Sequence, residues 1–136
     1  MNASLWAAFI GIVSGAVGYW FTTFSMQPIL RYRDIRNQIL KNFNYYAQVI
    51  KKDHINENFG DLYSERVLAN RKTSAELTAA ICDLPSWYLL YLKKCKGQSP
   101  TEAAKHLIGF SNTTEYEQAN KVENFIRKKL GLPQQA

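Results

Sequence analysis

The chain has 136 residues, of which 46% are apolar and 21% charged, so its composition is that of a globular protein and not of a disordered one. The length suits one small domain plus an anchoring segment. The net charge is +6, but residues 28–52 hold six basic side chains against Asp34 alone, whereas residues 53–136 are nearly balanced. Such a local basic excess favours anionic lipid headgroups over nucleic acid as the charge partner.

An uncharged apolar segment lies near the N-terminus. Leu5–Met26 comprises 22 residues, and as a helix at about 1.5 Å per residue it is roughly 33 Å long, which matches the hydrocarbon core of a bilayer. Trp6 lies near one end and Trp20 near the other, where interfacial rings are expected. We therefore predict a transmembrane anchor over residues 1–26. A signal peptide would need a basic residue before the apolar run, and a buried core helix is the other alternative.

The flanking charges predict the direction of this anchor. Arg31, Arg33 and Arg36 follow the apolar run, and no charged side chain precedes it. The positive-inside rule then places the N-terminus outside and the C-terminal domain in the cytoplasm, as in a single-pass protein of the bacterial inner membrane. The same arginines are candidates for lipid headgroup contact, although a topology signal alone would explain them equally well.

Small residues form a stripe along the predicted anchor. Ala7, Gly11 and Gly15 recur every four residues, and Gly18 lies in a second row beside them. Such faces let two backbones approach closely, so we predict packing against another transmembrane helix, from a second copy or a different protein. The alternative is that glycine is simply common in membrane helices.

Residues 27–136 are predicted to form about five helices, which makes the whole chain all-α. Pro28 is expected to end or kink the anchor, or to open the first of these helices at its first position. From Ile29, apolar residues recur at helical spacing and predict a buried face of Tyr32, Ile35, Ile39, Phe43, Tyr46 and Ile50. A polar loop over residues 51–60 and an N-cap at Asp61 are expected to follow.

The next helix is predicted over Leu62–Asp83, ending before Pro85. Its apolar face is assigned to Leu68, Ala75, Leu77, Ala80, Ile81 and Leu84. The polar face is assigned to Arg66, Asn70, Arg71 and Lys72.

Residues 86–96 combine six consecutive apolar side chains, Trp87–Leu92, with three trailing lysines. A helix buried on most sides is the favoured interpretation, with a strand or an interfacial helix as alternatives. Because the aromatic side chains would suit a docking surface, Trp87, Tyr88 and Tyr91 are the candidates for contact with a cytoplasmic protein partner.

Two helices complete the domain. Gly97 is expected to terminate the preceding helix, and Ser99-Pro100-Thr101-Glu102 predicts a capping box at the start of the next. Its apolar residues are Ala103, Ala104, Leu107, Ile108 and Phe110, with His106 packed or on the surface. The last helix should bury Tyr116, Ala119, Val122, Phe125, Ile126 and Leu130, place Arg127–Lys129 against its dipole, and end at Gly131.

Motifs for catalysis are missing from the sequence. There is no Gly-rich phosphate loop, GxSxG, HExxH or CxxC, and Cys82, Cys95 and the two histidines match no zinc spacing. Asp53, His54 and Glu57 are best explained as a solvated turn. We therefore predict no catalytic, cofactor-binding or metal-binding residue, and expect an adaptor or assembly subunit that docks a partner at the inner membrane face. The alternative is a homo-oligomeric, channel-like effector gated by its cytoplasmic domain.

Overall fold

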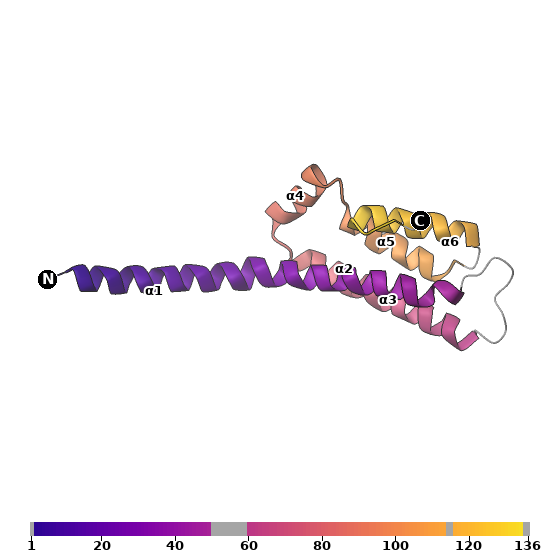
Figure 1. Ribbon diagram of the computed structural model, residues 1–136, viewed down its shortest axis with the longest axis horizontal. Coiled ribbons are helices and arrows are strands. Elements are labelled where there is room, and N and C mark those ends of the chain that lie inside the picture. Colours follow the sequence, from indigo (N-terminus) through magenta and orange to yellow (C-terminus); the bar gives the residue numbers. More distant parts are fainter. Residues whose placement is uncertain (1, 50–59, 114–115, 135–136) are drawn as a thin grey trace.

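The computed structural model describes residues 2–49, 60–113 and 116–134 (Figure 1). Among these residues the regular elements are all helical, which confirms the predicted all-α fold, with a long, apolar first helix and a bundle of helices. In chain order they are α1 (Ala3–Phe21), η1 (Thr22–Met26), α2 (Gln27–Tyr45), η2 (Tyr46–Val49), α3 (Gly60–Asp83), α4 (Ser86–Cys95), α5 (Pro100–Ser111) and α6 (Tyr116–Leu130).

The helices α1, η1 and α2 form one continuous rod of 43 residues. η1 is a π-helical turn, in which the Gln27 N–H donates to the Thr22 carbonyl five residues earlier. Pro28 explains this turn, because its ring would collide with the Phe24 carbonyl in a regular α-helix and it has no N–H to donate. The wider turn accommodates the proline, so Pro28 neither ends the helix nor begins a separate one.

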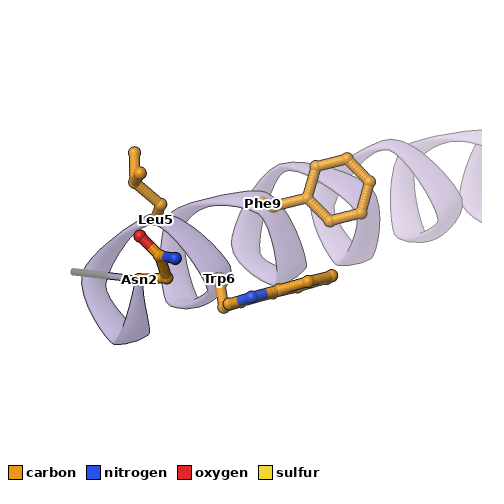
Figure 2. A pocket seen from close by; sticks show the side chains of 4 residues that line it. All are labelled: Asn2, Leu5, Trp6 and Phe9. Carbon is orange, nitrogen blue, oxygen red and sulfur yellow. The ribbon is translucent and has the colours of Figure 1, made fainter.

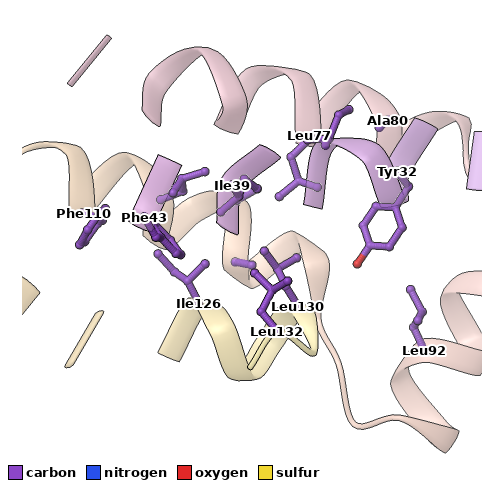
Figure 3. Packing of buried hydrophobic residues seen from close by; sticks show 14 of the residues in the cluster. Tyr32, Ile39, Phe43, Leu77, Ala80, Leu92, Phe110, Ile126, Leu130 and Leu132 are labelled. Carbon is purple, nitrogen blue, oxygen red and sulfur yellow. The ribbon is translucent and has the colours of Figure 1, made fainter. Parts of the chain in front are cut away.

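The second half of this rod carries the core of the bundle. Tyr32, Ile35, Ile39 and Phe43 are buried, as predicted, and pack against α3, α5 and α6 (Figure 3). Tyr46 is half-buried. Ile50 and most of the predicted loop lie outside the described residues, and Gly60 already belongs to α3, which places Asp61 in its first turn and not at its N-cap.

The inner face of α3 differs from the prediction. Leu77, Ala80 and Leu84 are buried and Ile81 is half-buried, but Leu68 is 70% exposed and Ala75 is exposed. The buried positions that continue the stripe toward the start of the helix are polar: Arg66, Asn70, Thr73 and Ser74. Thr73 and Ser74 satisfy their hydroxyls by donating to the Ala69 and Ala104 carbonyls, at 2.9 Å and 2.8 Å. Burial of Arg66, Thr73 and Ser74 is tolerated because each finds such acceptors, whereas the buried Asn70 Nδ2 has no hydrogen-bond partner among the described residues.

The segment after Pro85 is a helix, as predicted, but it is not buried on most sides. In α4 only Leu92 is buried. The predicted terminating glycines are both confirmed, because Gly97 and Gly131 have φ angles of +61° and +67°, the left-handed conformation that glycine adopts readily.

The start of α5 is at the predicted position, but the capping box does not form. Within the described residues, the Ser99 side chain makes no capping hydrogen bond. In a capping box the Ser99 backbone N–H would donate to the Glu102 carboxylate. Here it donates to the Lys129 carbonyl at 3.0 Å. Glu102 pairs with the Lys129 ammonium at 2.8 Å, so the two residues join α5 to α6.

The remaining assignments on α5 and α6 are mostly correct. Ala103, Ala104, Leu107 and Phe110 are buried, whereas Ile108 is half-exposed. Ala119, Ile126 and Leu130 are buried, and Val122 and Phe125 are half-buried. His106 is on the surface with its ring 4.4 Å from that of Phe125.

Candidate functional site

The first half of the rod is apolar and uncovered. It belongs to the single helix, among the described residues, that is long and apolar enough to cross a membrane, and none of that apolar stretch is buried. Leu5 is 63% exposed and Ile12 72% exposed. A core helix of a soluble domain would be buried, so that alternative does not fit this helix. Large contiguous apolar surfaces mark membrane or protein contacts.

The predicted small-residue face lies within this uncovered segment. A Cβ atom added at Gly11, Gly15 or Gly18 would meet no atom within 4 Å in the described chain. Ala7 is exposed on the same helix. The four positions are therefore open to a partner, and their role in packing stays a prediction.

A surface groove near the N-terminus of α1 is lined only by side chains of this helix and of the residue before it. It has a volume of about 450 Å³ and is lined by Asn2, Leu5, Trp6 and Phe9. Figure 2 shows these side chains projecting from successive turns, with the Trp6 and Phe9 rings side by side. Their centroids are 6.2 Å apart and their planes are perpendicular. Three of its four lining side chains are apolar, so this surface groove suits acyl chains better than a water-soluble ligand.

The three predicted headgroup-binding arginines lie just beyond the apolar segment, in different surroundings. Arg31 donates to Asp83 at 3.0 Å, and both side chains are more than half exposed. Arg33 is exposed and Arg36 is half-buried. A cleft of about 310 Å³ opens between this ion pair and the π turn, lined by Thr23, Phe24, Gln27, Pro28, Arg31 and Asp83. The pair thus ties the end of α3 to the start of α2 without removing Arg31 from solvent.

The helix α4 lies beside this same junction, at the end of the bundle nearest to α1 (Figure 1). Tyr88 faces inward, and its ring centroid is 6.3 Å from that of the buried Tyr32. Three other side chains face outward and form what we call the α4 outer face: Trp87, Leu90 and Tyr91, which are 54%, 51% and 42% exposed. Of the predicted partner surface, Trp87 and Tyr91 are therefore accessible, whereas Tyr88 mainly attaches α4 to α2.

Arg66 is a buried residue that the sequence pattern did not reveal. It is 1% exposed and donates to the Phe110 carbonyl at 2.9 Å and to the Thr113 carbonyl at 3.4 Å. Its guanidinium also lies 4.5 Å from the centroid of the Phe110 ring. Burial lowers the pKa of Arg66. The side chain caps the C-terminal end of α5, where carbonyls lack helical partners and a positive charge is favourable.

Arg127 is a second buried arginine, predicted only as a charge at the end of α6. It is 3% exposed, pairs with Glu123 at 2.7 Å and donates to the Pro133 carbonyl at 2.8 Å. It also reaches Asn44 of α2 at 3.4 Å. The helical spacing of Leu77, Ala80 and Leu84, continued toward the start of α3, would have placed residue 66 on the buried face. No comparable pattern indicates that residue 127 is buried.

These polar contacts hold helices together. Arg66, Asn70 and Glu123 line one cavity of only about 10 Å³, about the space that a single water molecule needs. Among the described residues, no three His, Cys, Asp or Glu side chains are grouped so that they could hold a metal ion. The features that remain open to a partner are the apolar half of the rod and the membrane-proximal end of the bundle. The chain matches no family model, no curated protein and no solved structure, so its function has to be inferred from these features.

Proposed function

We propose that this protein is a single-pass, membrane-anchored helical adaptor or assembly subunit. The observation that carries the proposal is the 43-residue rod, whose first half is apolar and uncovered while its second half forms the core of a bundle. Leu5–Met26 crosses the bilayer, and the positive-inside rule assigns the bundle to the cytoplasmic face because every basic side chain follows this segment.

The bundle is held directly at the membrane surface. Tyr32, its first buried core residue, lies six positions after Met26, which at about 1.5 Å per residue is roughly 9 Å along the helix. No linker separates anchor and domain. Tethering of this kind raises the local concentration of a bound partner at the membrane without any new contact, and this role needs no catalysis by the chain itself.

The partner within the membrane is a second transmembrane helix that packs on Ala7, Gly11, Gly15 and Gly18. Lipid chains are as apolar as leucine, so helices associate in a bilayer through close backbone contact at small residues. The open space at the three glycines supports this contact. The bundle then presents its own surface to a cytoplasmic protein.

Co-purification of the full chain from membranes in mild detergent, followed by crosslinking and native mass measurement, tests the proposal. We expect a stoichiometric complex that is lost in Gly11→Ile and Gly15→Ile. Ala16→Ile is the matched control, because at about 100° per residue Ala16 lies some 140° from Gly11 around the helix. A complex that survives all three substitutions would show that the small-residue face is not the contact.

Two further outcomes would replace the proposal. If the chain fractionates as a freely soluble protein, the anchor is wrong. If the purified chain forms a closed homo-oligomer that releases dye from liposomes, the channel-like effector is the correct function, with the mildly polar Thr22, Thr23 and Ser25 as its expected lining.

A further inference from the structure

We propose that α4 is an interfacial helix whose outer face lies in the headgroup layer of the bilayer that α1 crosses. The inference rests on the proposed anchor and adds a second, peripheral membrane contact. Its occupant is lipid, and specifically an anionic leaflet, and not a protein.

The position of α4 is the first argument. Tyr88 of α4 packs on Tyr32 of α2. The neighbouring residue Arg31 pairs with Asp83, which holds the end of α3 beside the same turn of α2. Tyr32 lies only six residues after the end of the apolar segment, so α4 is beside the region where the bilayer surface must be. Figure 1 shows α4 projecting from the bundle at this level, away from α5 and α6.

The exposed side chains of α4 are the second argument. Trp87 and Tyr91 are aromatic, and rings of this kind are enriched at the membrane–water boundary because one part is apolar and another polar. Leu90 adds an aliphatic group between them. In water these three side chains would expose a large apolar surface beside the apolar rod, whereas an interfacial position covers both with the same lipid.

Charge is the third argument and favours lipid over a protein partner. Lys93, Lys94 and Lys96 are exposed at the end of α4, and Arg33 is exposed on α2. A helix that combines exposed aromatic and leucine side chains with exposed lysines has the composition of helices that lie in an interface with anionic lipids. Leu30 of α2, four residues after Met26, is also 50% exposed.

The three tryptophans of the chain allow a direct depth measurement. Single-tryptophan variants of the full chain retain Trp6, Trp20 or Trp87, with the other two replaced by Phe. They are reconstituted in phosphatidylcholine–phosphatidylglycerol vesicles that carry a nitroxide either near the headgroup or near the acyl chain end. We expect the shallow label to quench the fluorescence of Trp87 more than the deep label does. The emission of Trp87 should also lie at a shorter wavelength than that of a tryptophan exposed to water.

The aqueous control carries Tyr45→Trp in a chain whose three native tryptophans are Phe. Tyr45 is 61% exposed and lies 19 residues after Met26, about 28 Å along the helix, so its replacement should be quenched by neither label. If Trp20 is quenched but Trp87 behaves like the Tyr45→Trp control, α4 faces water or a protein, and the inference is wrong while the anchor stands. If neither Trp6 nor Trp20 is quenched, the anchor itself is wrong.

The lysines provide an independent test of the lipid. Each of Lys93→Gln, Lys94→Gln and Lys96→Gln should weaken docking of α4 by about fivefold, since a basic residue near an anionic surface contributes about 1 kcal/mol. The triple variant on anionic vesicles should therefore show weaker quenching of Trp87 by the shallow label than the native chain shows, closer to that of the native chain on pure phosphatidylcholine. Unchanged quenching of Trp87 in the triple variant would contradict the assignment of an anionic leaflet.

Discussion

Arg127 donates from both Nε and Nη2 to one carboxylate oxygen of Glu123, at 3.0 Å and 2.7 Å, one turn earlier in α6. Both side chains are almost completely buried, at 4% and 7% exposure. The guanidinium also reaches Asn44 and the Pro133 carbonyl. One buried cation therefore joins α6 to α2 and to the segment that follows α6.

Removing the carboxylate of this pair should be strongly destabilising. In Glu123→Ala the Arg127 charge remains buried without its partner, which typically costs about 3–5 kcal/mol. Chemical unfolding of the detergent-solubilised chain, followed by circular dichroism, measures the change in the free energy of unfolding. Glu102→Ala is the matched control, because that carboxylate pairs with Lys129 at the surface and its loss should change stability little. Equal effects of both substitutions would contradict a structural role for the buried pair.

Arg66→Ala tests the cap on α5. Because the Phe110 carbonyl keeps only its bond from the Thr113 N–H at 3.2 Å and the Thr113 carbonyl loses its Arg66 donor, we expect a loss of about 1–3 kcal/mol in the free energy of unfolding. Arg71→Ala, five residues later on the same helix, removes only an exposed contact to Asn112 and should be nearly neutral. Amide hydrogen exchange should also accelerate in the last turn of α5 in the first variant and not in the second.

Tyr32 should make the protein sensitive to alkaline pH. Burial raises the pKa of its phenol above the ordinary value of 10.0, so above that pH the unfolded chain releases this proton while the folded chain keeps it. The contribution to stability is complete below the unfolded pKa and falls as pH rises, by at most about 1.4 kcal/mol per pH unit. Unfolding measured from roughly pH 9 to pH 11 should show a shallower decline in Tyr32→Phe than in the native chain.

A comparison with Tyr91→Phe isolates the buried phenol, since Tyr91 is on the α4 outer face. Among the described residues the Tyr32 hydroxyl has no hydrogen-bond partner, so its removal should not lower stability at neutral pH. A Tyr32→Phe variant with the same alkaline decline as the native chain would show that other groups cause it.

Pro28→Ala should convert the π turn toward regular α-helix. The substitution restores an N–H and removes the ring that collides with the preceding turn, a conflict that costs about 3 kcal/mol in an unrelieved helix. We expect slower amide exchange over residues 24–28 and a modest gain in thermal stability. Unchanged exchange in this segment would mean that Pro28 is not the cause of the π turn.

The sequence predicted the elements better than it predicted their polar interior. Apolar periodicity identified the buried face of α2 because Tyr32, Ile35 and Ile39 are large, apolar and regularly spaced. The same criterion put Leu68 inside and Arg66 outside, since hydrophobicity alone cannot show that the C-terminal carbonyls of α5 will provide acceptors for a buried guanidinium. That information exists only once two distant segments have met.

Local motifs failed for a related reason. The capping box at Ser99 has the correct residues, but the Lys129 carbonyl of a distant helix takes the backbone donor on which the motif depends. The favoured interpretation of residues 87–92 as mostly buried was wrong for Trp87, Leu90 and Tyr91, because an unbroken apolar run has no period that shows which of its side chains are exposed. The small-residue face, the headgroup arginines and the α4 outer face concern partners outside the chain, and they stay predictions for the experiments above.

Because α1 continues into α2 without a break, a tilt of α1 displaces the far end of α2. The part beyond Met26 extends about 28 Å along the axis, so a tilt of about 20°, common for membrane helices, would swing the far end of α2 sideways by about 10 Å. A change in bilayer thickness or in the neighbour packed on α1 would then move whatever the bundle holds. With α1 in a bilayer as proposed, the continuous helix through the junction would couple events inside the membrane to positions well outside it.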